Sequence, residues 1–113
     1  MKARFLLALF LVFGVFGAMA QDDGPTVAVM TPFLAQPGTQ LMVTAFEEYA
    51  VEQGYNVDVI DTAGDVAALV SRMEDVALQG VDAIVIQVDP AQVGPGLQAA
   101  ADAGIPVFGM DSG

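Results

Sequence analysis

Hydrophobic and polar positions along the chain form two alternating patterns. Four short runs are rich in apolar residues, and they are Thr26–Met30, Asn56–Ile60, Ala83–Val88 and Pro106–Met110. The first and third of these runs are nearly continuous in valine, isoleucine, alanine and methionine. Continuous apolar runs of this length are typical of strands buried on both faces of a parallel sheet. We therefore expect four strands.

The stretch between the first two runs has the spacing of an amphipathic helix. Its apolar positions recur at intervals of three and four residues, and they are Leu41, Met42, Ala45, Phe46 and Tyr49. Glutamates occupy other positions of the same stretch, as on a solvated helix face. Gly54 supplies a helix end, because glycine readily adopts the left-handed conformation found there.

Two more helices are expected in the second half of the chain. One has an apolar stripe from Val66 to Ala77, with Asp65 as a plausible N-cap and Gly80 as its end. The other begins near Pro95, because proline is tolerated in the first turn of a helix, and ends at Gly104.

The predicted order is therefore β-α-β-α-β-α-β, which indicates an α/β fold with a doubly wound parallel sheet. In such sheets ligands bind outside the carboxyl ends of the strands. The loops after the four strands are thus the candidate site, and they span Thr31–Thr39, Asp61–Asp65, Asp89–Gln92 and Asp111–Gly113.

Residues 1–20 have the order of a secretory signal peptide. Lys2 and Arg4 precede the wholly apolar run Phe5–Phe16, and Ala18–Ala20 offers a small-x-small cleavage pattern. A membrane anchor is the alternative, but the uncharged stretch is shorter than the ~20 residues that span a bilayer. We expect cleavage after Ala20, a periplasmic or secreted protein, and no membrane insertion afterwards. Residues 21–25 are then a flexible leader and residues 26–113 the folded part.

The charge balance narrows the class of partner. The chain has 3 basic and 14 acidic residues and a formal charge of −11, which becomes −13 when Lys2 and Arg4 are removed with residues 1–20. Nucleic acid would be repelled by such a surface, so it is not an expected partner. The chain has neither cysteine nor histidine, which removes thiol chemistry, histidine-based catalysis and the usual zinc ligands.

No motif predicts catalysis or a cofactor. Neither Ser71 nor Ser112 lies in a G-x-S-x-G sequence, and no base is available to activate either one. Gly94–Ala99 fits the dinucleotide pattern G-x-G-x-x-A, but five residues separate it from the strand that ends at Val88, where the pattern needs an immediate turn. We expect a protein that is not an enzyme and has no cofactor or metal.

Asp111 is the most specific binding candidate. It follows the fourth strand directly, at the end of the sheet where ligands bind. A carboxylate there can accept two hydrogen bonds from the hydroxyl groups of a polyol or sugar. The alternative is that Asp111 caps a following helix.

Three stretches together resemble the N-terminal part of a type I periplasmic substrate-binding protein, of the ribose-binding-like class that serves sugar transporters. They are TVAVMTPFLAQPGTQLMVTAFEEYAVEQGYNVDV, LVSRMEDVALQGVDAIVIQ and LQAAADAGIPVFGMDS. The resemblance implies a ligand held between two α/β lobes that close by a hinge. It also implies that Thr31, Phe33, Gln36 and Asp111 contact the ligand, with Gln87–Asp89 lining the cleft nearby.

The function implied by this resemblance is capture of a sugar or similar small polar ligand and its delivery to the membrane permease of an ABC transporter. Many sugar binders of the class place aromatic residues just after the proline of the first loop, whereas Pro37 is followed by Gly38 and Thr39 here. The ligand class therefore stays open to non-sugar molecules. The chain is expected to supply an incomplete N-terminal lobe. By itself this lobe should bind weakly, because half a site leaves most of the ligand's surface exposed to water. The alternative function is a self-standing structural or interaction lobe.

Overall fold

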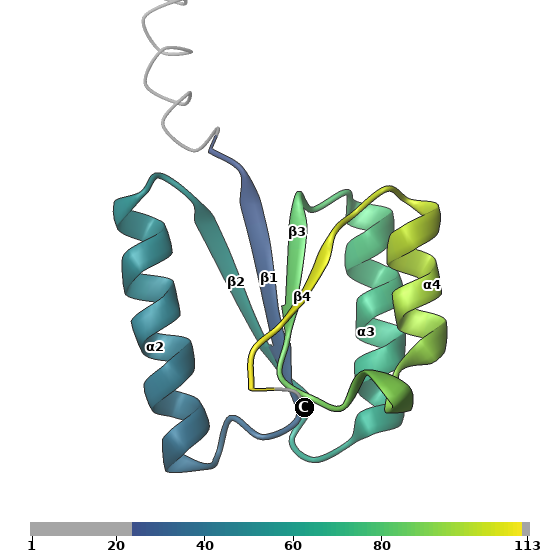
Figure 1. Cartoon of the computed structure of the whole chain (residues 1–113), viewed down its shortest axis with the longest axis horizontal. Coiled ribbons are helices and arrows are strands. Elements are labelled where there is room, and N and C mark those ends of the chain that lie inside the picture. Colours follow the sequence, from purple (N-terminus) through teal and green to yellow (C-terminus); the bar gives the residue numbers. More distant parts are fainter. Residues whose placement is uncertain (1–23, 112–113) are drawn as a thin grey trace, which may run out of the picture.

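The computed structural model describes residues 24–111 (Figure 1). Its elements are β1 (Thr26–Thr31), α2 (Pro37–Glu52), β2 (Asn56–Asp61), α3 (Val66–Gln79), β3 (Ala83–Ile86), the 3₁₀ helix η2 (Pro90–Gln92), α4 (Gly94–Asp102) and β4 (Val107–Gly109). The predicted signal peptide and residues 21–23 of the predicted leader lie outside the described residues. Between residues 24 and 111, no helix is long and apolar enough to cross a membrane.

The strands form one parallel sheet in the order β2-β1-β3-β4. This arrangement confirms the α/β fold expected from the alternation of strands and helices. β1 lies inside the sheet and pairs with β2 on one side and β3 on the other. Both β1 and β3 are buried over nearly their whole length, as their continuous apolar runs predict.

The ends of all four strands differ from the prediction. β2 continues through Asp61, one residue beyond the predicted end at Ile60, so Asp61 belongs to the strand and not to the loop. β1 continues through Thr31, because this residue pairs with Asp61 of β2, so Thr31 belongs to the strand and not to the loop. β3 ends at Ile86 rather than at Val88, because its pairing with both neighbouring strands stops there. β4 is one residue shorter at each end than expected.

Helices cover the two faces of the sheet unequally. Figure 1 shows α2 alone on one face and α3 with α4 on the other. The larger hydrophobic core lies between the sheet and α3 and α4, and it includes Met30, Leu69, Met73 and Ile84. The smaller core lies between the sheet and α2. The fold therefore buries one sheet face more completely than the other.

The prediction of which residues of the first helix are buried is wrong for several members of the apolar stripe. α2 buries Thr39, Val43 and Ala50. Three members of the predicted stripe are exposed: Leu41 and Tyr49, at 75% and 66%, and Ala45. The physical reason is that the apolar surface of α2 is wider than the part that the sheet covers, and the buried face is centred to one side of the predicted stripe.

The boundaries of α3 confirm both capping predictions. The side chain of Asp65 accepts a hydrogen bond from the backbone N–H of Ala68 at 2.9 Å. At the other end, Gly80 adopts the left-handed conformation with a φ of 77°, which costs little only for glycine. α4 begins at Gly94, so Pro95 stands in its first turn as expected.

Gly96 allows α4 to lie close against α3. A Cβ atom at Gly96 would stand 2.7 Å from Sδ of Met73, whereas a Cβ at Gly94 meets nothing within 4 Å. We expect Gly96→Ala to lower the free energy of unfolding by about 1–3 kcal/mol, because a well-packed core resists overpacking. Gly94→Ala is the matched control and should change it by less than about 0.5 kcal/mol. Urea denaturation of the two variants makes the comparison, and equal stabilities would contradict this account of the contact.

Candidate functional site

The carboxyl ends of all four strands lie at the same edge of the sheet, because the sheet is parallel (Figure 1, lower end). The loops that follow these strands therefore gather there. These are the loops in which the sequence places its candidate binding residues. We call this edge, with the loops that begin after β1, β2, β3 and β4, the carboxyl edge.

A buried hydrogen-bond network joins β1, α2 and the residue that follows β3 at the carboxyl edge. The hydroxyl of Thr31 donates to Oε1 of Gln87 at 2.8 Å. The hydroxyl of Thr39, in the first turn of α2, approaches the same oxygen at 3.3 Å. All three side chains are less than a tenth exposed. The amide of Gln87 thus ties the start of α2 to the end of β1.

Thr39 is a residue that the sequence analysis missed as part of the site. It lies within the loop predicted after the first strand, but no motif distinguishes it there. The available signal is that two threonines, Thr31 and Thr39, bracket that loop. Small hydroxyl side chains at both ends of a loop can share one buried acceptor.

The loop between β1 and α2 is built as a tight turn. The backbone N–H of Phe33 donates to the hydroxyl of Thr31 at 2.9 Å. The backbone N–H of Gln36 then donates to the carbonyl of Phe33 at 2.9 Å. Phe33 is partly buried and packs against the larger core. Gln36 is exposed and precedes α2 without a side-chain capping bond.

Asp61 connects this first loop to the loop after β2. One of its carboxylate oxygens accepts from the backbone N–H of Ala63 at 3.1 Å and from that of Leu34 at 3.4 Å. The backbone N–H of Thr62 also donates to the carbonyl of Thr31 at 3.1 Å. The first two loops therefore form one connected unit. The sequence placed Asp61 in a candidate loop without assigning it a role.

Two exposed carboxylates lie at the ends of β3 and β4. Asp89 caps the short η2 helix, because its Oδ1 accepts from the backbone N–H of Ala91 at 3.0 Å. Asp111 is exposed and has a φ of 49°, a left-handed conformation that aspartate tolerates better than most residues. The backbone N–H of Met110, the preceding residue, donates to the carbonyl oxygen of Ile86 at 2.8 Å. This bond holds the end of β4 and the start of its following loop beside β3.

The carboxyl edge therefore combines a rigid base with exposed polar groups. The base is the network of Thr31, Thr39 and Gln87. The exposed groups are the amide of Gln36 and the carboxylates of Asp89 and Asp111. These groups can form hydrogen bonds with a polyhydroxylated molecule. In residues 24–111, no three acidic side chains come together as a metal site would need.

Comparison with known proteins assigns the chain to a family. Residues 27–113 match the periplasmic binding protein domain family. Comparison with curated protein sequences gave no match. Since the family match covers most of the chain, the chain belongs to the periplasmic binding protein domain family.

Solved structures with the same fold are solute-binding proteins. LsrB from Clostridium saccharobutylicum in complex with AI-2 is 31% identical, with a TM-score of 0.70 over 78% of this chain and 28% of that one. An ABC transporter solute-binding protein from Mycobacterium smegmatis with bound glycerol is 27% identical, with a TM-score of 0.72 over 78% of this chain and 31% of that one. A periplasmic solute-binding protein from Actinobacillus succinogenes with bound D-allose is 27% identical, with a TM-score of 0.70 over 77% of this chain and 32% of that one.

The chain spans about a third of the length of the solved structures that it matches. Its four-stranded parallel sheet corresponds to part of one lobe of the periplasmic binding protein fold. The similarity supports a role in ligand binding within a family of binding proteins that are not enzymes.

Proposed function

We propose that the chain is part of the N-terminal lobe of an exported solute-binding protein that captures a sugar or a similar polyhydroxylated ligand. The carboxyl edge supplies one wall of the ligand cleft. The observation that carries this proposal is the arrangement of exposed polar groups on a buried base. Asp89 and Asp111 are exposed at the ends of adjacent strands, next to a first loop that the Thr31–Gln87 bond holds in place.

The residues at this edge have two different roles in the proposal. Gln36, Asp89 and Asp111 contact the ligand through hydrogen bonds, because their side chains are exposed. Phe33 contributes the edge of an aromatic ring to the same wall. Thr31 and Gln87 are positioning residues, because they are almost completely buried and their side chains bind each other.

The ligand class follows from the chemistry of these groups. Carboxylates accept hydrogen bonds from hydroxyl groups and repel anions, so a neutral polyol or sugar suits them better than an acidic solute. Glycerol and D-allose, which occur in two of the similar structures, belong to this class. The captured ligand is then delivered to the membrane permease of an ABC transporter, after export of the chain to the periplasm and cleavage after Ala20.

Asparagine variants of the two exposed carboxylates test the proposal. We expect the chain to bind D-allose or glycerol in the millimolar range, because one wall covers only part of a ligand. Loss of a charge-assisted hydrogen bond in Asp89→Asn or Asp111→Asn should weaken binding about tenfold. Saturation-transfer NMR on the full chain measures this affinity. Asp75→Asn, an exposed site on α3, is the control, and an equal loss in all three variants would contradict the proposed wall.

A further inference from the structure

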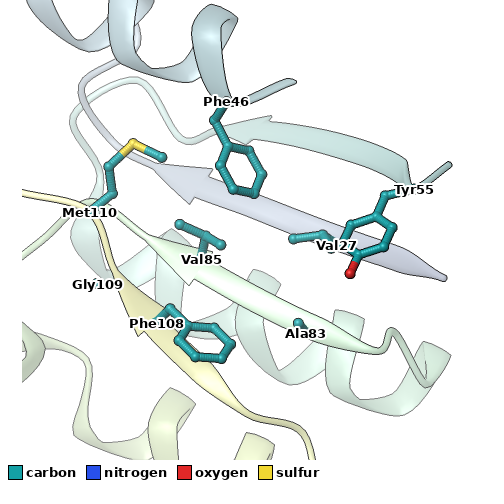
Figure 2. A pocket seen from close by; sticks show the side chains of 8 residues that line it. All are labelled: Val27, Phe46, Tyr55, Ala83, Val85, Phe108, Gly109 and Met110. Carbon is teal, nitrogen blue, oxygen red and sulfur yellow. The ribbon is translucent and has the colours of Figure 1, made fainter. Parts of the chain in front are cut away.

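The turn after β2 lies beside the first loop, which joins β1 to α2. α2 packs mainly against β2. On the side of β3 and β4 it borders an open apolar hollow of about 430 Å³, which Figure 2 shows between Phe46, Val85 and Phe108. The loop that leads into α2 therefore takes much of its support from the β2 side. We call residues 62–65, which follow the last residue of β2, the β2 turn.

Three hydrogen bonds join the end of β2 and the β2 turn to the first loop. The backbone N–H of Gly64 donates to the carbonyl oxygen of Pro32 at 2.6 Å. The two bonds described above lie on either side of it, one at the carbonyl oxygen of Thr31 and the other between the N–H of Leu34 and Oδ1 of Asp61. The backbone of the first loop is thus held at positions before, at and after its proline.

The β2 turn contains a residue in an unfavourable backbone conformation. Ala63 has a φ of 52° and Gly64 a φ of 88°, and the N–H of Asp65 donates to the carbonyl oxygen of Thr62 at 3.0 Å. Turns with two left-handed central residues favour glycine, asparagine and aspartate. An alanine persists in this conformation only where surrounding bonds fix it. The bond from the N–H of Ala63 to Oδ1 of Asp61, at 3.1 Å, is one of them.

We propose that Asp61 is a positioning residue for ligand binding at the carboxyl edge. Its Oδ1 accepts from Ala63 and from Leu34, so a single oxygen atom fixes the β2 turn and the first loop together. The first loop carries Phe33 and Gln36, which face the ligand in the proposed function, and the role of Asp61 rests on that function. A loop that is ordered before the ligand arrives loses less conformational entropy on binding.

Direct contact with the ligand is the other role open to Asp61, because its side chain is exposed at the carboxyl edge. Positioning is favoured because Oδ1 already accepts from two backbone N–H groups. The two roles differ in what they need from the side chain. Positioning needs an oxygen acceptor, whereas a charge-assisted bond to a ligand hydroxyl needs the carboxylate itself.

Asp61→Ala and Asp61→Asn separate these roles, because asparagine keeps an oxygen acceptor and alanine does not. We expect Asp61→Ala to weaken the binding of D-allose about three- to tenfold, and Asp61→Asn to weaken it less than about twofold. Saturation-transfer NMR on the full chain measures both affinities. Asp58→Ala, which removes an exposed carboxylate from the middle of β2, is the control and should leave the affinity unchanged.

The hydrogen-exchange rate of the Leu34 amide adds a readout that needs no ligand. This N–H donates to Asp61, so its exchange should be about fivefold faster in Asp61→Ala than in Asp61→Asn. Asp58→Ala should leave the rate unchanged. Circular dichroism checks that each variant is folded.

Three results would overturn the proposal. Equal losses of affinity in Asp61→Ala and Asp61→Asn would mean that the carboxylate itself binds the ligand. An unchanged affinity in Asp61→Ala would mean that the first loop does not need this bond. If the unsubstituted chain bound neither D-allose nor glycerol, the proposed function would fail and the role in binding with it, and the Leu34 exchange rates would then report on the loop alone.

Discussion

Replacing Leu69 by alanine is expected to lower the free energy of unfolding by about 2–5 kcal/mol, the range for buried leucines. Leu69 is fully buried in α3 and belongs to the larger core between the sheet and α3 and α4. Truncating the side chain loses the free energy gained by burying its methyl groups away from water. It also leaves a cavity that the surrounding side chains only partly fill. A domain of this size has little stability to lose, so the variant should be largely unfolded near room temperature.

Leu78→Ala is the matched control, because Leu78 lies on the same helix and its side chain is 88% exposed. This change should alter the free energy of unfolding by less than about 0.5 kcal/mol. Urea denaturation followed by circular dichroism measures both variants. Equal losses in the two variants would mean that α3 does not pack on the sheet through the face described above.

Replacing Gln87 by leucine is expected to have the second-largest effect, a loss of about 1–3 kcal/mol in the free energy of unfolding, because a buried hydroxyl loses its hydrogen-bond acceptor. Two hydroxyls, those of Thr31 and Thr39, share Oε1 of Gln87. Leucine has a similar size but accepts no hydrogen bond, so the change separates the polar contribution from the packing contribution. Since this network positions the first loop, ligand binding at the carboxyl edge should weaken as well.

Gln92→Leu is the control for this second prediction, since Gln92 is exposed at the end of η2. Denaturant titration should show a clear difference in midpoint between the two leucine variants. Gln87→Glu adds a conservative comparison, because it keeps an oxygen acceptor for both hydroxyls. If Gln87→Leu proved as stable as Gln92→Leu, the network would contribute nothing to holding the loop.

The sequence pattern predicts the fold well because the sheet interior is fully buried. β1 and β3 can be recognised from their continuous apolar runs, since strands covered on both faces need no polar alternation. Asp65 and Gly80 mark the ends of α3 through chemistry that acts locally. These signals depend on neighbours in the chain, so the sequence carries them directly.

Long-range contacts were harder to predict. The apolar surface of α2 is broader than the area that the sheet covers, so spacing alone could not show that Val43 is buried while Leu41 is exposed. The candidate loops were located by topology, but the pairing of Thr31 with Gln87 joins residues 56 positions apart. No local sequence pattern predicts a hydrogen bond between residues so far apart in the chain.

Mapping the ligand contacts by NMR tests the central claim most directly. The full chain, labelled with ¹⁵N, is titrated with D-allose and with glycerol while the backbone amide shifts are followed. Our account predicts saturable shifts at Phe33, Gln36, Asp89 and Asp111, at the carboxyl edge of the sheet. Shifts confined to residues away from this edge, such as Val43 of α2, or no shifts at the highest soluble ligand concentration, would contradict it.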